Sequence, residues 1–191
     1  MISLQEKTFY LTFDGAVNPP GTLRILEVLS RHGIHATFFV EGHRIAGQEE
    51  ILREMISAGH HLGNHSFTHP DFSTLEPEAC MEEVRKTDEA LFQATGLRTK
   101  LLRPPCGILP DDKRKLLESA GYQICLWSIS VKDWLGPDAR SVAERTLSLA
   151  RESTVTAVYH DHVDWTPETV ELILPKLQDL GYSICPVPYA P

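Results

Sequence analysis

Two histidines spaced four residues apart, His65 and His69, are the sharpest chemical signal in the sequence. On one turn of helix this spacing would put both imidazoles on the same face, within reach of one divalent cation at about 2.1 Å. The pair lies in the turn-rich stretch Gly-Asn-His-Ser-Phe-Thr-His-Pro, directly after a predicted strand. His61 and His65 share the same spacing, so the pattern by itself leaves chance open. We predict a divalent metal site at the later pair, with zinc as the expected cation.

Other reactive side chains stand where predicted strands end. Asp14 follows Tyr-Leu-Thr-Phe, Arg103 follows Leu-Leu, and His160 follows Ala-Val-Tyr. Asp133 and Trp134 come shortly after a further strand. The carboxyl ends of parallel strands share one edge of a sheet, where α/β proteins collect their chemistry. One such residue could be a loop cap, but together with the histidine pair they predict a common site.

The elements that must position these residues alternate between short β-branched or aromatic runs and longer helical patterns, which is typical of repeated βα units. The predicted strands cover 9–13, 36–40, 60–64, 100–103, 122–127, 156–160 and 182–187. The longest helix is predicted over 77–95, and Pro175 is expected to kink or split the last helix. We predict one α/β domain over 1–191, with about seven strands in a closed or nearly closed barrel.

Length and charge exclude several classes of protein. With 191 residues the chain can bury a core without a structural metal or disulfides, so a metal site would be functional. Its net charge of −8, with scattered Lys and Arg, gives no basic surface for nucleic acid. No apolar run is long enough for a membrane span, and no signal-type stretch follows the first residue. As written, the sequence predicts a cytoplasmic protein with no membrane span and no nucleic-acid partner.

Five motifs come in a recognisable order. They are Leu-Thr-Phe-Asp (11–14), Asn-His-Ser-Phe-Thr-His-Pro (64–70), Leu-Arg-Pro-Pro-Cys-Gly (102–107), Trp-Ser-Ile-Ser-Val-Lys-Asp-Trp (127–134) and Tyr-His-Asp (159–161). In order and approximate spacing they resemble the motifs of the polysaccharide deacetylases, carbohydrate esterase family four, also known as the NodB-homology domain. The resemblance covers nearly the whole chain. It implies a distorted (β/α) barrel that removes N-acetyl groups from amino-sugar oligomers or polymers with the help of a divalent metal.

Carried over to this sequence, the resemblance makes His65 and His69 metal ligands, in agreement with their spacing. Asp14 becomes the catalytic base, and Arg103 becomes the cation that pairs with it and keeps it ionised. A metal, a base for the attacking water and an acid for the leaving nitrogen form a coherent hydrolytic set.

The resemblance also assigns the second half of the site. His160 becomes the general acid that protonates the leaving amine, and Asp133 becomes its supporting carboxylate. The backbone N–H of Cys106 would help to stabilise the oxyanion. The residues expected to contact substrate are Trp134, Cys106, Pro105 and Tyr159.

The first motif departs from the family pattern. It usually reads Thr-Phe-Asp-Asp-Gly-Pro, with the first Asp as base and the second as metal ligand, but here Gly15 follows Asp14. An alignment without a gap as far as Thr22, which matches the family's usual helix-opening Thr, makes Asp14 the base. It then places Gly15 where the family has the metal-ligand Asp. A gapped alignment would instead make Asp14 the ligand and remove the base. We favour the ungapped alignment, which leaves an incomplete ligand set that water or a side chain close in sequence, Asn18 or Asp71, would need to complete.

Two further functions compete with the deacetylase. One is a metal-independent relative that acts on a cyclic amide, which the lost Asp favours and the retained histidine pair disfavours. The other is a carbohydrate-binding domain without activity, which the retention of both His160 and Asp133 disfavours. Family members usually work on wall or capsule polymers outside the cytoplasm, so a periplasmic or secreted location would follow if a leader had been trimmed.

Overall fold

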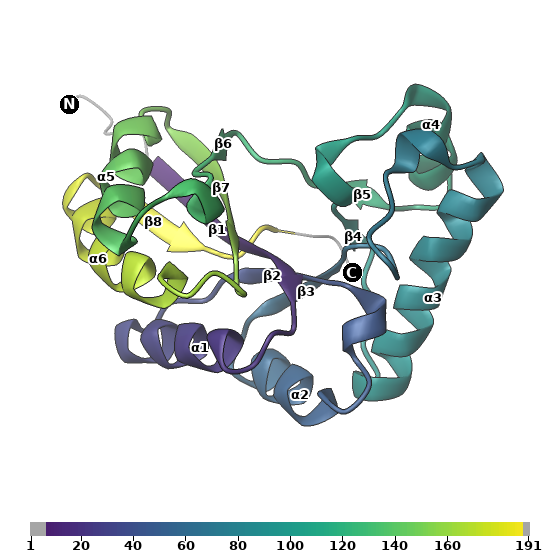
Figure 1. Cartoon of the computed structure of the whole chain (residues 1–191), viewed down its shortest axis with the longest axis horizontal. Helices are drawn as coiled ribbons and strands as arrows, with labels where there is room; N and C mark the ends of the chain where they lie inside the picture. The colour runs from purple at the N-terminus through teal and green to yellow at the C-terminus, as the bar shows by residue number, and fades with distance from the viewer. Residues whose placement is uncertain (1–6, 189–191) are drawn as a thin grey trace, which may run out of the picture. The chain divides into compact units, whose positions relative to one another are not determined.

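The computed structural model describes residues 7–188, and its internal contacts divide the chain into two compact units. The first unit comprises residues 7–14, 18–37 and 127–187, and the second comprises 15–17, 38–126 and 188. The prediction of a single domain over 1–191 stays a prediction. Each unit combines parallel strands with helices, as the alternating sequence pattern predicts (Figure 1).

The first unit is built around the amino-terminal strand. Its strands are β1 (Lys7–Ala16), β6 (Ile129–Ser130), β7 (Thr154–His160) and β8 (Tyr182–Cys185). They lie in the order β8-β1-β7-β6 and are parallel, so that Asp14 of β1 sits opposite His160 of β7. Its helices are α1 (Gly21–His32), α5 (Ala139–Leu149) and α6 (Thr166–Asp179), with the short 3₁₀ helix η4 (Asp133–Leu135). Helix α6 contacts α1, α5 and β8. This register puts two of the predicted catalytic residues side by side.

Apolar periodicity explains how these helices bury one face. In α1 the buried residues Ile25, Val28 and Leu29 recur at helical spacing, and Gly33 ends the helix in the left-handed conformation at φ 63°. Helix α6 continues through Pro175 as one element, so the expected split is wrong, whereas the expected kink stays a prediction. The buried residues Ile173, Leu174 and Leu177 flank the proline on both sides, and this packing outweighs the lost backbone donor.

The second unit carries the remaining strands and helices. Its strands β2 (Thr37–Val40), β3 (His61–Asn64), β4 (Leu101–Leu102) and β5 (Gln123–Ile124) lie in the order β5-β4-β3-β2. The end of β1 joins this unit, where Glu41 N donates to Ala16 O at 3.0 Å. Its helices are α2 (Glu49–Ser57), α3 (Pro77–Thr95) and α4 (Asp111–Ser119), with the 3₁₀ helices η1 (Gly42–Arg44), η2 (Phe72–Thr74) and η3 (Pro105–Gly107). Helix α3 has the predicted bounds and contacts α2 and α4 (Figure 1).

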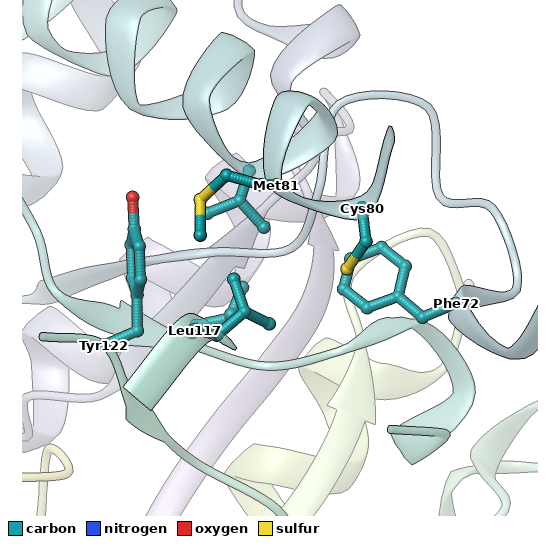
Figure 2. Packing of buried hydrophobic residues seen from close by; sticks show 7 residues of the cluster. Phe72, Cys80, Met81, Leu117 and Tyr122 are labelled. Atoms are coloured by element: carbon teal, nitrogen blue, oxygen red, sulfur yellow. The ribbon is translucent and has the colours of Figure 1, made fainter. Parts of the chain in front are cut away.

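One apolar cluster holds α3 and α4 together. Figure 2 shows its labelled side chains, and the full cluster is Phe72, Cys80, Met81, Val84, Leu102, Leu117 and Tyr122. Burying side chains of this size removes apolar surface from water at about 25 cal/mol per Å². The cluster therefore fixes α3 and α4 beside β4, whose Leu102 belongs to it and precedes Arg103.

The strands agree with the prediction in number and differ from it in length. Residues 7–188 contain eight strands where about seven were predicted, and the additional one is the two-residue strand β6. The predicted strand 122–127 shrinks to Gln123–Ile124. Within the described chain no helix is both long and apolar enough to cross a bilayer.

Candidate active site

The two predicted metal ligands lie close together in the second unit. The ring centroids of His65 and His69 are 4.9 Å apart, and His65 is 2% exposed. The segment after β3 is a loop, as its turn-rich sequence predicts, and in it Ser66 and His69 have φ of 64° and 58° instead of helical values. A left-handed conformation at two non-glycine residues is unusual and needs support from its surroundings. The loop therefore brings the rings together by a different route from the one that the spacing predicts.

Hydrogen bonds supply that support. Glu83 of α3 accepts from Phe67 N at 3.1 Å and from Thr68 N at 2.7 Å. Asn64, at the end of β3, accepts from Ser66 N at 2.8 Å, and the Ser66 hydroxyl accepts from the backbone N–H of His69 at 3.0 Å. Sequence reasoning missed Glu83 because nothing in a helical sequence indicates which distant loop it will bind.

The tautomer of His65 suits a metal ligand. Its Nδ1 lies 2.8 Å from the backbone carbonyl oxygen of Arg103, which can only accept. Nδ1 therefore carries the hydrogen in the neutral ring, and the lone pair is on Nε2. Metal-binding histidines usually donate their other ring N–H in this way.

These two histidines are the candidate ligands that the loop after β3 brings together. Within residues 7–188 no group of three His, Cys, Asp or Glu residues could hold a metal ion. The Asp71 carboxyl accepts from Ser73 N at 2.8 Å and begins η2, while Asn18 donates its amide hydrogen to Asp161 at 2.8 Å. The two imidazoles fit a divalent cation, but the set is one short of the three protein ligands typical of catalytic zinc.

Arg103 is fully buried in the second unit. Its Nε donates to Cys125 O at 3.0 Å, and its guanidinium lies 4.1 Å from the centroid of the Phe39 ring. A buried guanidinium is costly unless it is paired or well hydrogen-bonded. The predicted ion pair with Asp14, which is 4% exposed in the first unit, stays a prediction.

The first unit contains the predicted acid and its partner. Nδ1 of His160 donates to Asp133 Oδ1 at 2.9 Å, and the backbone N of His160 donates to Asp133 Oδ2 at 2.7 Å. Asp133 is fully buried, and it also accepts from the Thr166 hydroxyl at 3.2 Å. Trp165 Nε1, which sequence reasoning did not place here, donates to the backbone oxygen of Asp133 at 2.9 Å. These bonds hold the imidazole in one orientation, with its other nitrogen available for proton transfer.

Charge around His160 favours its protonated form. Burial lowers the pKa of the imidazole, but the hydrogen bond to Asp133 and the charges of Asp133 and Asp14 raise it by more. The net pKa lies above the ordinary value of about 6.5. A raised pKa favours the protonated imidazole, which is the form that a general acid needs.

The raised pKa also predicts how stability depends on pH. The folded protein binds the His160 proton more tightly than the unfolded chain does. His160 therefore contributes its full stabilisation below the unfolded pKa of about 6.5, and this stabilisation is lost as pH rises through the folded pKa. We expect the urea midpoint of the wild type to fall more than that of His160→Gln between about pH 6 and pH 9. Equal falls in the two proteins would show that His160 binds its proton no more tightly than in the unfolded chain.

The four predicted substrate contacts differ in exposure. Trp134 is 47% exposed, and its ring stands edge-on to His160 with centroids 4.9 Å apart. Cys106 is exposed with φ 55°, whereas Pro105 is buried.

Tyr159 requires a correction. It is fully buried, and its hydroxyl lies 2.8 Å from the hydroxyl of Thr146 in α5. Alternate residues of a strand point to opposite faces, so the neighbour of His160 points into the helix layer. Its side chain belongs to the core of the first unit and is not a substrate contact.

Comparisons with known proteins agree with the motif pattern. The sequence profile described as polysaccharide deacetylase matches residues 2–125. A chitooligosaccharide deacetylase from Bradyrhizobium sp. (strain ANU 289) is 31% identical over 95% of this chain and 90% of its own length. The peptidoglycan-N-acetylmuramic acid deacetylase PdaC from Bacillus subtilis (strain 168) is 31% identical over 95% of this chain and 38% of its own length. The chain thus spans nearly all of the first relative and less than half of the second.

Solved structures show the same fold. The structure of PdaC from Bacillus subtilis matches with a TM-score of 0.88 over 95% of this chain and 88% of that chain, at 31% identity. Wild-type BA3943 from Bacillus anthracis, described as a CE4 family pseudoenzyme, matches with a TM-score of 0.89 over 95% and 64%, at 26% identity. The predicted NodB-like α/β fold is confirmed. The chain belongs to the polysaccharide deacetylase family, whose enzymes are hydrolases acting on carbon–nitrogen bonds other than peptide bonds.

Proposed function

We propose that this protein is a metal-dependent hydrolase that removes N-acetyl groups from amino-sugar oligomers or polymers. The observation that carries the proposal is the His160–Asp133 pair, because a buried carboxylate holds an imidazole of raised pKa opposite Asp14 in the β1–β7 register. That arrangement provides an acid and a base side by side. The chitooligosaccharide and peptidoglycan deacetylases named above support the substrate class.

In this mechanism Asp14 and His160 each transfer one proton. Asp14 takes a proton from the water that attacks the acetyl carbonyl carbon, and Arg103 is the cation that we propose as its partner. His160 gives its proton to the sugar nitrogen as the carbon–nitrogen bond breaks, so acetate and a free amine leave in equal amounts. Asp133 holds His160 and balances the positive charge of the imidazolium before transfer.

His65 and His69 would hold the metal. A divalent cation there supplies a Lewis acid for the acetyl carbonyl and lowers the pKa of water. With two histidines as the only protein ligands among residues 7–188, we expect weaker metal binding than three ligands would give.

Metal binding can be tested without substrate. Zinc-soaked crystals should show an anomalous peak at the zinc edge within bonding distance of both imidazoles. In solution, His65→Ala and His69→Ala should each lower zinc affinity by at least about tenfold. His61→Ala is the matched control, because it breaks only the rival pair of the same spacing and should leave affinity unchanged. An empty site under excess zinc, or a loss in His61→Ala, would contradict the assignment.

Product analysis tests the function against its alternatives. The protein is incubated with N-acetylglucosamine oligomers, with peptidoglycan fragments and with a cyclic amide, and acetate and new amines are measured. Equal amounts of acetate and amine from the first two support the deacetylase. Opening of the cyclic amide that persists after chelation would instead indicate the metal-independent relative.

A further inference from the structure

Asp161, the residue after His160, is a fully buried carboxyl group that the proposed chemistry does not use. It accepts from the backbone N of Asn18 at 3.0 Å, from the side-chain amide of Asn18 at 2.8 Å and from the hydroxyl of Thr22. A buried carboxylate is costly unless such partners satisfy it. All of these donors come from the segment 18–22, which lies far from Asp161 in sequence.

The start of α1 packs directly on the backbone at the same place. A Cβ atom at Gly21 would lie 2.0 Å from the carbonyl oxygen of Asp161, a distance no side chain can occupy. Helix α1 has no side-chain cap and no acidic residue in its first turn. Asp161 therefore places a negative charge at the N-terminal end of α1, where the helix itself has no acidic residue.

The position of this contact in the chain links it to the proposed acid and base. Asp161 directly follows His160, and Asn18 is four residues after Asp14. His160 and Asp14 are themselves cross-strand partners. The hydrogen bonds of Asp161 thus join the two loops that leave the ends of β1 and β7.

We propose that Asp161 is a positioning residue: by fastening Asn18 and Thr22 to the end of β7, it keeps Asp14 and His160 at a fixed separation. It is not a catalytic residue, because its carboxyl group is fully buried and engaged with the protein. The expected effect of Asp161 on catalysis rests on the proposed function, whereas its effect on the placement of Asp14 and His160 does not.

The experiment breaks the contact in two independent ways. Asp161→Asn replaces one of two acceptor oxygens with an NH₂ group that faces a donor. Thr22→Val removes only the hydroxyl and keeps the shape, and Thr22→Ser restores the hydroxyl. Asp164→Asn is the matched control, because it makes the same charge change at an exposed residue three positions away.

Two measurements are made on each protein. The first is the ¹H and ¹⁵N chemical shifts of the His160 ring and of the Asp14 amide, recorded at one pH without substrate. The second is kcat and KM for acetate release from N-acetylglucosamine oligomers. We expect Asp161→Asn and Thr22→Val to move both sets of shifts and to lower kcat by about 10- to 100-fold with KM little changed, since small misplacements of reacting groups cost this much. Thr22→Ser and Asp164→Asn should match the wild type.

Each other outcome is decisive. If Asp161→Asn and Thr22→Val only lower the melting temperature, with unchanged His160 and Asp14 shifts and unchanged kcat, Asp161 is merely structural. If Asp164→Asn produces the same shifts, charge alone is responsible and the proposal fails. If no protein releases acetate but the shifts move as expected, the proposed function fails and the positioning role stands. Should Asp161→Asn not fold, Thr22→Val against Thr22→Ser gives the same decision.

Discussion

Asp14→Asn is expected to reduce acetate release to background while leaving the zinc content of the protein unchanged. An amide of the same shape cannot take a proton from water, and loss of a positioned base costs about 10²- to 10⁴-fold. Asp14 is almost fully buried and lies opposite His160, so solvent cannot readily replace it. Turnover and bound zinc are measured on the same preparation.

The zinc content decides between the two alignments of the first motif. If Asp14→Asn empties the metal site, Asp14 is a ligand and the gapped alignment is right. Gly15→Asp is the complementary variant, because the ungapped alignment places the missing ligand there. Gly15 has φ 81°, and Asp tolerates left-handed backbone better than most residues. We expect Gly15→Asp to bind zinc more tightly than the wild type, and an unchanged affinity would contradict the ungapped alignment.

His160→Ala is expected to lower kcat by about 10²- to 10⁴-fold, the usual contribution of a positioned general acid. The reason is that a sugar amine is a poor leaving group unless its nitrogen is protonated as the bond breaks. The kcat of Asp133→Asn should lie between those of the wild type and His160→Ala, because the imidazole would remain but would lose the carboxylate that orients it.

The neighbouring His162 provides the control for this prediction. It is exposed, and its ring centroid is 5.5 Å from that of His160. We expect His162→Ala to lower kcat by less than about tenfold. This loss is well below the loss that removal of a positioned acid usually causes. Equal rates in His160→Ala and the wild type would make His160 a structural residue.

Periodic and terminal signals in the sequence predicted most of the fold. The helix Pro77–Thr95 has its predicted bounds because proline at its start, Gly96 at its end and a regular apolar face all agree. Tertiary packing decided what local signals could not: α6 passes through Pro175, and β6 forms by pairing with β7 although only two residues take part. Periodicity predicts the burial of residues more reliably than it predicts the pairing of short strands.

The sequence indicated candidate site residues but not how the structure arranges them. The spacing of His65 and His69 indicated a shared ligand, yet a loop with left-handed residues rather than a helix brings the rings together. Glu83 and Asp161, which hold the loops, were missed because their hydrogen-bond partners are distant in sequence. Tyr159 was misassigned because a motif does not show which face of a strand its residues occupy.

Acetate release from N-acetylglucosamine oligomers directly tests whether this protein is a metal-dependent deacetylase. Wild-type protein is assayed after loading with zinc or cobalt and again after chelation, with His160→Ala in parallel and oligomer binding measured for each form. We expect acetate and free amine in equal amounts from the loaded wild type, little from the chelated protein, and at least about 100-fold less from His160→Ala. No acetate above background from any form, with oligomers still bound, would rule out the deacetylase and indicate a carbohydrate-binding domain.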